Sequence, residues 1–130
     1  MNQNLINKYK IELKNKVFNF ETGKEIHKSI NTTNGELTTF LNDWRVESIT
    51  DYLIPETEKV LNCVEQELET GSETITIFIK QSDVDFYDYD GDYVNSIPTQ
   101  DFKEIIIGWR DFLLTPPAAQ SLPTLSNNKK

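Results

Sequence analysis

Cysteine and histidine are almost absent from this sequence, and their scarcity excludes several kinds of site. Cys63 is the only cysteine and His27 the only histidine among 130 residues. A single cysteine permits no disulfide within the chain, and one Cys with one His cannot supply a zinc site. His27 lies in the polar stretch KEIHKSI, which favours a surface residue over a catalytic one. Cys63 falls in a helical apolar pattern, so we predict a small buried side chain.

Glycine is also scarce, and long apolar runs are missing. The five glycines are not grouped, so the sequence has no glycine-rich loop that would hold phosphate. No run approaches the roughly 18 apolar residues of a membrane span. The first residues, MNQNLINKYKIELKNK, lack the apolar stretch of a signal peptide. We therefore expect a cytoplasmic protein with no membrane partner.

Basic residues are fewer than acidic ones, and the charge is unevenly distributed along the chain. The formal net charge is −8; residues 1–30 hold six lysines and three glutamates, a net +3, so the remaining residues carry −11. Nucleic acid needs a basic footprint, which argues against it as a direct partner. The charge is compatible with a basic protein partner. Paired carboxylates without a predictable pocket are weak evidence for glycosidase chemistry, and we expect no enzymatic activity.

The sequence does contain enough apolar material for one domain. The hydrophobic share is 37% and the aromatic share is 11%, and a chain of this length can bury one core. We predict a single α+β domain over residues 1–114, in which two or more helices pack on a small antiparallel sheet. Residues 115–130 lack periodicity and are rich in Pro, Ser and Asn, which predicts a flexible C-terminal tail.

Helical periodicity predicts two of the elements. Residues 55–70 place apolar side chains on one face, begin with a glutamate-rich turn and precede Gly71, an expected helix stop. Residues 99–114 form the plainest helix, with Thr99 as the expected N-cap and prolines after its end. Residues 37–54 fit a helix or a strand. The apolar stripe of the last helix comprises Phe102, Ile105, Ile106, Trp109, Phe112 and Leu113.

Alternation with a period of two predicts strands in two regions. Residues 9–20 alternate between polar and apolar side chains and predict a strand or hairpin turning near Gly23, although residues 4–16 also fit a helix. Residues 28–37 have the composition of a loop. Residues 74–87 predict two strands joined at KQSD, with isoleucine and valine towards the core and the aspartates and Tyr87 outwards.

The stretch DVDFYDYDGDY, residues 83–93, has five aspartates and three tyrosines but no basic residue. It fits a calcium loop, a solvated turn, or a surface that binds a basic partner. If Gly91 takes the sixth position of a helix-loop-helix calcium loop, Phe86 and Ile97 occupy the first and twelfth, where oxygen ligands are required. We therefore predict neither a metal nor another cofactor.

The binding interpretation combines charge with aromatic area. Aspartates accept paired hydrogen bonds from arginine, and tyrosines supply rigid contact area with a polar tip. Three glutamates, Glu65, Glu67 and Glu69, could extend this acidic surface, although a solvated helix face is the simpler interpretation. The predicted partner-binding residues are Asp83, Asp85, Tyr87, Asp88, Tyr89, Asp90, Asp92 and Tyr93.

The hairpin TITIFIKQSDVDFYDYD followed by IPTQDFKEIIIGWRDFLL resembles bacterial immunity proteins of contact-dependent inhibition and related polymorphic toxin systems. The resemblance covers residues 73–114, and its pattern is carried by Pro98, Phe102, Ile105, Trp109, Phe112 and Leu113. It implies a cytoplasmic protein that binds a cognate toxin domain, commonly a nuclease, and blocks its active site. An acidic adaptor or regulatory subunit of another complex is the alternative, and a small-molecule or ion-binding domain is a third.

Overall fold

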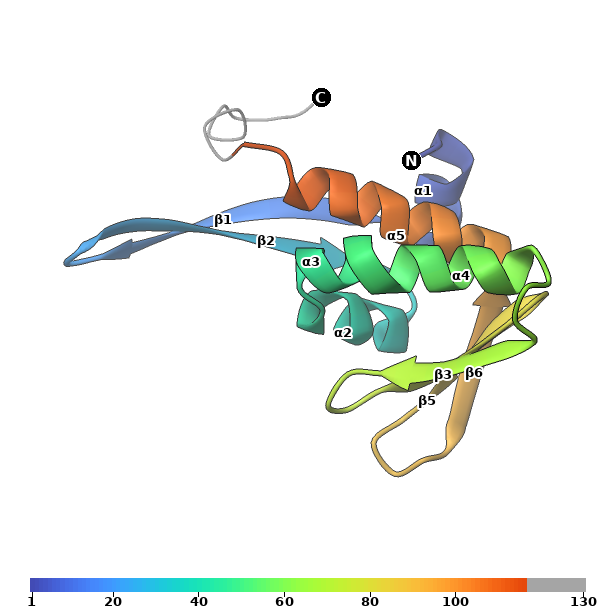
Figure 1. Cartoon of the computed structure of the whole chain (residues 1–130). Coiled ribbons are helices and arrows are strands. Elements are labelled where there is room, and N and C mark those ends of the chain that lie inside the picture. Colours follow the sequence, from blue (N-terminus) through green and yellow to red (C-terminus); the bar gives the residue numbers. More distant parts are fainter. Residues whose placement is uncertain (117–130) are drawn as a thin grey trace.

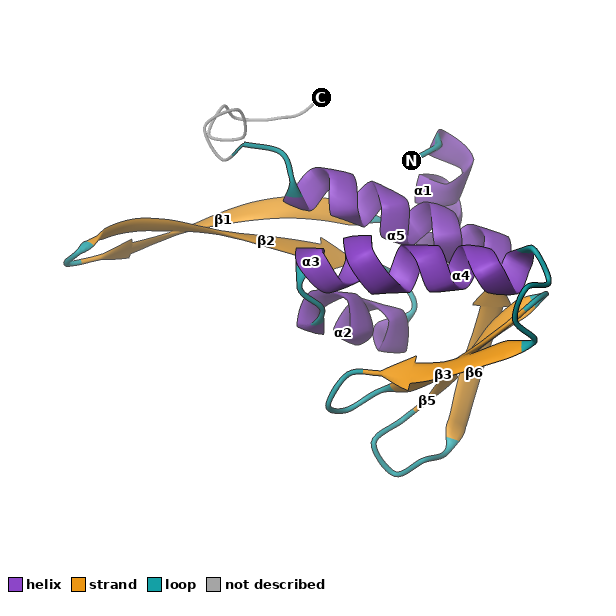
Figure 2. Cartoon of the chain, viewed as in Figure 1, coloured by secondary structure: helices purple, strands orange, loops and turns teal. Residues whose placement is uncertain are grey.

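A layer of helices covers one face of a four-stranded antiparallel sheet, and a two-stranded hairpin projects from the body (Figures 1 and 2). The computed structural model describes residues 1–116. The architecture is a compact α+β domain, which confirms the predicted fold class. Most of the predicted tail, from residue 117 onwards, lies outside the described residues.

The chain begins with a helix and then forms the projecting hairpin. The elements of this half are α1 (Gln3–Tyr9), β1 (Glu12–Phe20), β2 (Gly23–Asn31), α2 (Gly35–Asp43), α3 (Val46–Ser48), the π-helical turn η1 (Ile49–Leu53) and α4 (Ile54–Leu61). The second half contains β3 (Glu67–Gly71), β4 (Thr76–Lys80), β5 (Asp83–Tyr87), β6 (Tyr93–Pro98) and α5 (Thr99–Leu113). The larger sheet has the strand order β3-β4-β5-β6.

For the first twenty residues, the predicted hairpin and the alternative helix both prove partly correct. Residues 3–9 are helical, and Asn2 caps this helix by accepting a hydrogen bond from the backbone N–H of Leu5. Lys10 ends the helix in the left-handed conformation, with a φ of 49°. The alternating residues after it form β1, which turns at Gly23 into β2 as predicted. The loop predicted at residues 28–37 is shorter, because β2 extends to Asn31 and α2 already begins at Gly35.

The helix predicted at residues 55–70 is wrong at both ends. The helical path begins upstream at Val46, and the π-helical turn η1 lies directly before Pro55, which is in the first turn of α4. Proline cannot donate a backbone hydrogen bond, and a widened turn is one way to accommodate it within a helix. Helix α4 then ends at Leu61, and residues 67–71 form β3 instead. Gly71 is therefore not a helix stop: it ends β3, where any Cβ would collide with the backbone of Ile75.

The core lies between the helices and the inner face of the larger sheet. Side chains alternate along β4 and β5, so Ile77, Ile79, Val84 and Phe86 are fully buried, as predicted from the period of two. Helix α5 supplies Phe102, Ile105, Ile106 and Trp109 to the same core. Thr99 is not the N-cap of α5. It is the first helical residue, and its hydroxyl donates to the carbonyl O of Lys80 at 2.5 Å, which joins the helix to the sheet.

Candidate protein-binding surface

The outer face of the larger sheet, opposite the helices, gathers most of the predicted acidic and aromatic residues. Antiparallel partners point to the same face, so the strand register determines which side chains are neighbours. Asp85 on β5 lies beside Phe78 on β4. Asp83 and Tyr87 on β5 lie beside Pro98 and Tyr93 on β6. The outward direction predicted for the aspartates of β5 and for Tyr87 is therefore present in the structure.

Asp85 is already engaged within the chain. Its carboxylate lies 2.8 Å from Lys80 Nζ and accepts a hydrogen bond of 2.6 Å from the hydroxyl of Ser96. Burial alone would raise the pKa of Asp85, but these two bonds outweigh it and hold the pKa below its ordinary value. A partner's cation would have to compete with Lys80, so Asp85 is less available for binding than the sequence suggested.

Asp88 organises the loop between β5 and β6. One oxygen of its carboxylate accepts the backbone N–H groups of Asp90 and Asp92, both at 3.0 Å. Its backbone N–H donates to the carbonyl O of Asp92, and Gly91 completes the turn with a φ of 84°. Glycine adopts this conformation without steric cost. Asp88 therefore holds the loop in shape, while within residues 1–116 the carboxylates of Asp90 and Asp92 form no ion pair.

The three tyrosines have different surroundings. Tyr87 contacts Phe78 and Tyr93 edge-on, with ring centroids 5.3 and 5.7 Å apart. The Tyr93 hydroxyl forms a 2.7 Å hydrogen bond with Ser96. Tyr89, at the tip of the loop, is 79% exposed and stacks on no other aromatic ring of the described chain. Tyr89 is thus the most available aromatic contact, and Tyr87 with Tyr93 forms a fixed aromatic base beside it.

Two acidic residues join this face through a strand that the sequence did not predict. Glu67 and Glu69 lie on β3, opposite Lys80 and Phe78 of β4, and both are exposed. Since paired residues share a face, these glutamates extend the outer face beyond β4. Both glutamates fall within the helix that the sequence predicts at residues 55–70. Their alternation with Leu68 and Thr70 was the signal that could have identified the strand.

The other residues considered in the sequence lie elsewhere. Cys63 is exposed and not buried as predicted: it follows α4 in a turn, has a φ of 62° and accepts a hydrogen bond from Gln81. His27 is on the projecting hairpin, 2.9 Å from Glu25. Across residues 1–116, no three His, Cys, Asp or Glu side chains converge as a metal site would require.

We define the candidate surface as Glu67, Glu69, Asp83, Asp85, Tyr87, Asp88, Tyr89, Asp90, Asp92 and Tyr93. No family model, curated protein or solved structure matched the chain in comparisons with known proteins. In the described part of the chain, none of the helices has both the length and the apolar character needed to cross a membrane.

Proposed function

We propose that this protein is an immunity protein that binds a basic toxin domain, most simply a nuclease, and occludes its active site in the cytoplasm. The observation that carries the proposal is the coincidence of exposed carboxylates and aromatic rings on one sheet face and its adjoining loop. Nucleases hold phosphate with Lys and Arg, and carboxylates presented by a rigid sheet can occupy the same cations. The protein would act by binding alone, without a reaction of its own.

The arrangement of the surface supports separate roles for its residues. Asp90, Asp92, Glu67 and Glu69 present charge to solvent, which speeds the encounter with an oppositely charged partner. Tyr89 projects from the loop and supplies the area that a hot-spot residue buries. Asp88 and Asp85 fix the loop and the strand pair through the bonds described above. We therefore assign partner recognition to the solvent-exposed carboxylates and Tyr89. We assign to Asp85 and Asp88 the role of holding the strands and the loop in place.

The first test identifies the partner. The tagged chain is used to capture proteins from the cells in which it naturally occurs, in parallel with an Asp90→Asn/Asp92→Asn/Tyr89→Ser variant. We expect the unmodified chain to retain a basic protein with nuclease or other toxic activity, and the variant to lose it. Capture of a non-toxic cellular complex would favour the adaptor alternative, and equal capture by both chains would remove the candidate surface from the interaction.

The second test measures association rates of the captured toxin domain by stopped flow at several salt concentrations. Asp90→Asn/Asp92→Asn should slow association about tenfold at low ionic strength and flatten the dependence on salt, because two unpaired charges are lost. The matched control is Asp43→Asn/Asp51→Asn, which removes two exposed carboxylates of the helical layer that form no ion pair within residues 1–116. Equal slowing in both variants would show that net charge matters and not this surface.

A further inference from the structure

The four strands of the larger sheet and their turns carry charge of almost one sign. Residues 67–98 hold eight carboxylates, and Lys80 is the only basic residue among them. Such an excess of negative charge favours a cationic partner over a neutral or an acidic one. The position of Lys80 within this segment therefore indicates where a cation is held.

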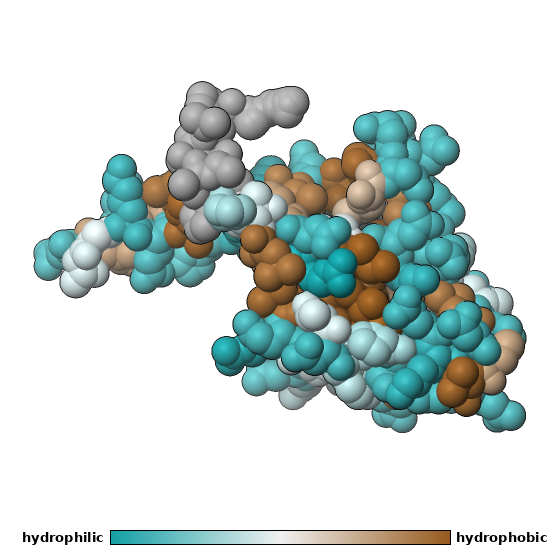
Figure 3. Space-filling view, turned by 45° about the horizontal axis from the view of Figure 1, so that its top comes forward, coloured by the Kyte–Doolittle hydropathy of each residue, from teal (hydrophilic) through white to brown (hydrophobic). Residues whose placement is uncertain are grey.

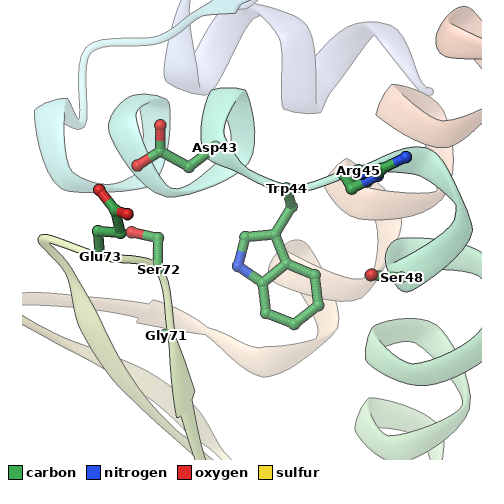
Figure 4. A pocket seen from close by; sticks show the side chains of 7 residues that line it. All are labelled: Asp43, Trp44, Arg45, Ser48, Gly71, Ser72 and Glu73. Carbon is green, nitrogen blue, oxygen red and sulfur yellow. The ribbon is translucent and has the colours of Figure 1, made fainter.

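Two other surface features carry charges of both signs. The β1–β2 hairpin stands out from the body in Figure 3 and exposes apolar side chains, but residues 12–31 mix four lysines with three glutamates. A pocket of about 380 Å³ lies between the end of α2 and the β3–β4 turn. Asp43 and Glu73 border this pocket, but Arg45 lines it as well (Figure 4). Neither feature selects a partner by the sign of its charge.

The middle of the outer sheet face places one aromatic ring between two carboxylates. Phe78 on β4 is paired with Glu69 on β3 and with Asp85 on β5, so the three side chains form a row across the sheet. Neighbouring Cβ atoms in such a row are roughly 5 Å apart, which brings both carboxylates within reach of one cation over the ring. Phe78 is half-buried and its ring meets that of Tyr87 edge-on. In the described chain no cation of the protein lies over the Phe78 ring.

Lys80 already supplies a cation to one end of this row. Its Nζ lies 2.8 Å from one oxygen of Asp85, and the other oxygen accepts the hydroxyl of Ser96. The bond to Asp85, and then the charges of Asp83 and Glu67, raise the pKa of Lys80 above its ordinary value. Glu67 lies opposite Lys80 on β3 and forms no ion pair in the described chain. Lys80 thus has a second carboxylate to which it can turn when another cation takes Asp85.

We propose that Glu69, Phe78 and Asp85 form a subsite for an arginine side chain of the protein partner, and that Lys80 occupies its acidic end until the partner binds. A guanidinium group is planar, so its face stacks on the phenyl ring while its N–H groups donate to the carboxylates on either side. Lys80 then turns to Glu67, and Asp85 keeps a cation as its neighbour. Lysine suits this subsite less well, because its ammonium group is a compact, strongly hydrated point charge.

The first experiment measures this preference with two labelled synthetic peptides. One peptide has four arginines separated by glycines, and the other has lysines at the same positions. Fluorescence anisotropy should find that the unmodified chain binds the arginine peptide about fivefold more tightly, because the charges are equal and only the guanidinium group stacks. Equal affinities, or no binding of either peptide, overturn the proposal.

Lys80→Met removes the internal competitor. It should tighten binding of the arginine peptide about fivefold, because the guanidinium group no longer displaces an ammonium group from Asp85. The matched control is Lys103→Met, which removes the same charge from α5, where Lys103 lies 3.4 Å from Glu58. The proposal is overturned if both variants tighten binding equally, which would be an effect of net charge, or if Lys80→Met leaves binding unchanged.

Phe78→Leu tests the ring separately from the charges. Leucine keeps an apolar side chain at this position but offers no π face, so the two peptides should bind this variant with equal affinity. Tyr52→Leu, which removes a 40% exposed ring from the helical layer, should retain the preference for arginine. A Phe78→Leu chain that still prefers the arginine peptide contradicts the subsite.

The subsite rests on the proposed function in one respect, namely that the partner is a basic protein. The peptides test it without the toxin, so the two proposals can fail separately. Preference for arginine together with capture of a non-toxic basic protein would support the subsite and refute the immunity function. Capture of a toxin by a chain that binds both peptides equally would support the function and refute the subsite.

Discussion

At the scale of single residues, Asp101 joins the first helix to the last. Its carboxylate accepts hydrogen bonds from Lys8 Nζ at 2.9 Å and from the Tyr9 hydroxyl at 2.7 Å. Burial alone would raise the pKa of Asp101, but the two bonds outweigh it and hold the pKa below its ordinary value. Burial, and then the bond to Asp101, raises the pKa of Tyr9 far above its usual range. The ionised Asp101 and the neutral Tyr9 therefore stabilise each other.

Asp101→Asn should lower the free energy of unfolding by about 1–2 kcal/mol at neutral pH. A carboxylate whose pKa is lower in the folded state stabilises the fold above its unfolded pKa, near 3.9, and loses that contribution as the pH falls through the folded value. The difference between variant and unmodified chain should therefore shrink below about pH 4. Urea unfolding at pH 7 and at pH 3 measures it, and an equal difference at both values would contradict the assignment.

At the scale of elements, Lys28 determines how firmly the β1–β2 hairpin is attached to the rest of the domain. Burial lowers the pKa of Lys28, yet its ammonium group reaches the carbonyl end of α5, where a cation is favoured. Its Nζ also lies 5.1 Å from the centre of the Phe112 ring. One side chain of β2 thus caps the last helix and orients the hairpin.

Lys28→Met should preserve most of the apolar packing while removing the cap, at a cost of about 1 kcal/mol. We expect faster hydrogen exchange in β1, β2 and the last turn of α5, because the hairpin is then held less firmly against α5. The exchange of β4 and β5, at the centre of the larger sheet, should not change. Lys24→Met, near the turn of the same hairpin, is the matched control for charge, and equal effects of the two substitutions would refute the anchoring role.

At the scale of the whole molecule, Phe102 joins the helical layer to the sheet. Its ring lies 6.2 Å from that of Phe40 on α2 and 6.5 Å from that of Phe86 on β5, measured between centroids, and it is fully buried. Trp109, about two turns further along the same face of α5, donates from its indole to the carbonyl O of Leu41 at 3.2 Å. Helices and sheet therefore share one core and should unfold together.

Phe102→Ala should destabilise the protein by about 3–5 kcal/mol, since a large cavity would open between the layers. Far-ultraviolet circular dichroism and tryptophan fluorescence should report the same, earlier unfolding midpoint, as expected of a single cooperative core. Val64→Ala, at an exposed position, should change stability by less than about 0.5 kcal/mol. Two separate transitions in the variant would mean that the halves of the molecule unfold independently.

Local sequence patterns predicted those helices and strands whose own residues show a clear helical or alternating periodicity. The stripe of α5 and the alternation of β4 and β5 predicted these elements and the outward direction of Asp83, Asp85 and Tyr87. Residues 67–71 were not predicted as a strand, because their glutamates and isolated apolar residue fit the helical period as well as the period of two. Their strand conformation comes from pairing with β4, which is a non-local interaction.

By itself, then, the sequence determined the class of the fold, the buried face of each clear element and the acidic, aromatic character of one hairpin. Only the tertiary structure decided which of these carboxylates are bonded within the chain and which are open to solvent. Lys80 and Ser96 reach Asp85 through strand register, and the loop geometry turns Asp88 inwards to its own backbone. Periodicity encodes which way a side chain points, but its partner depends on segments brought together by the fold.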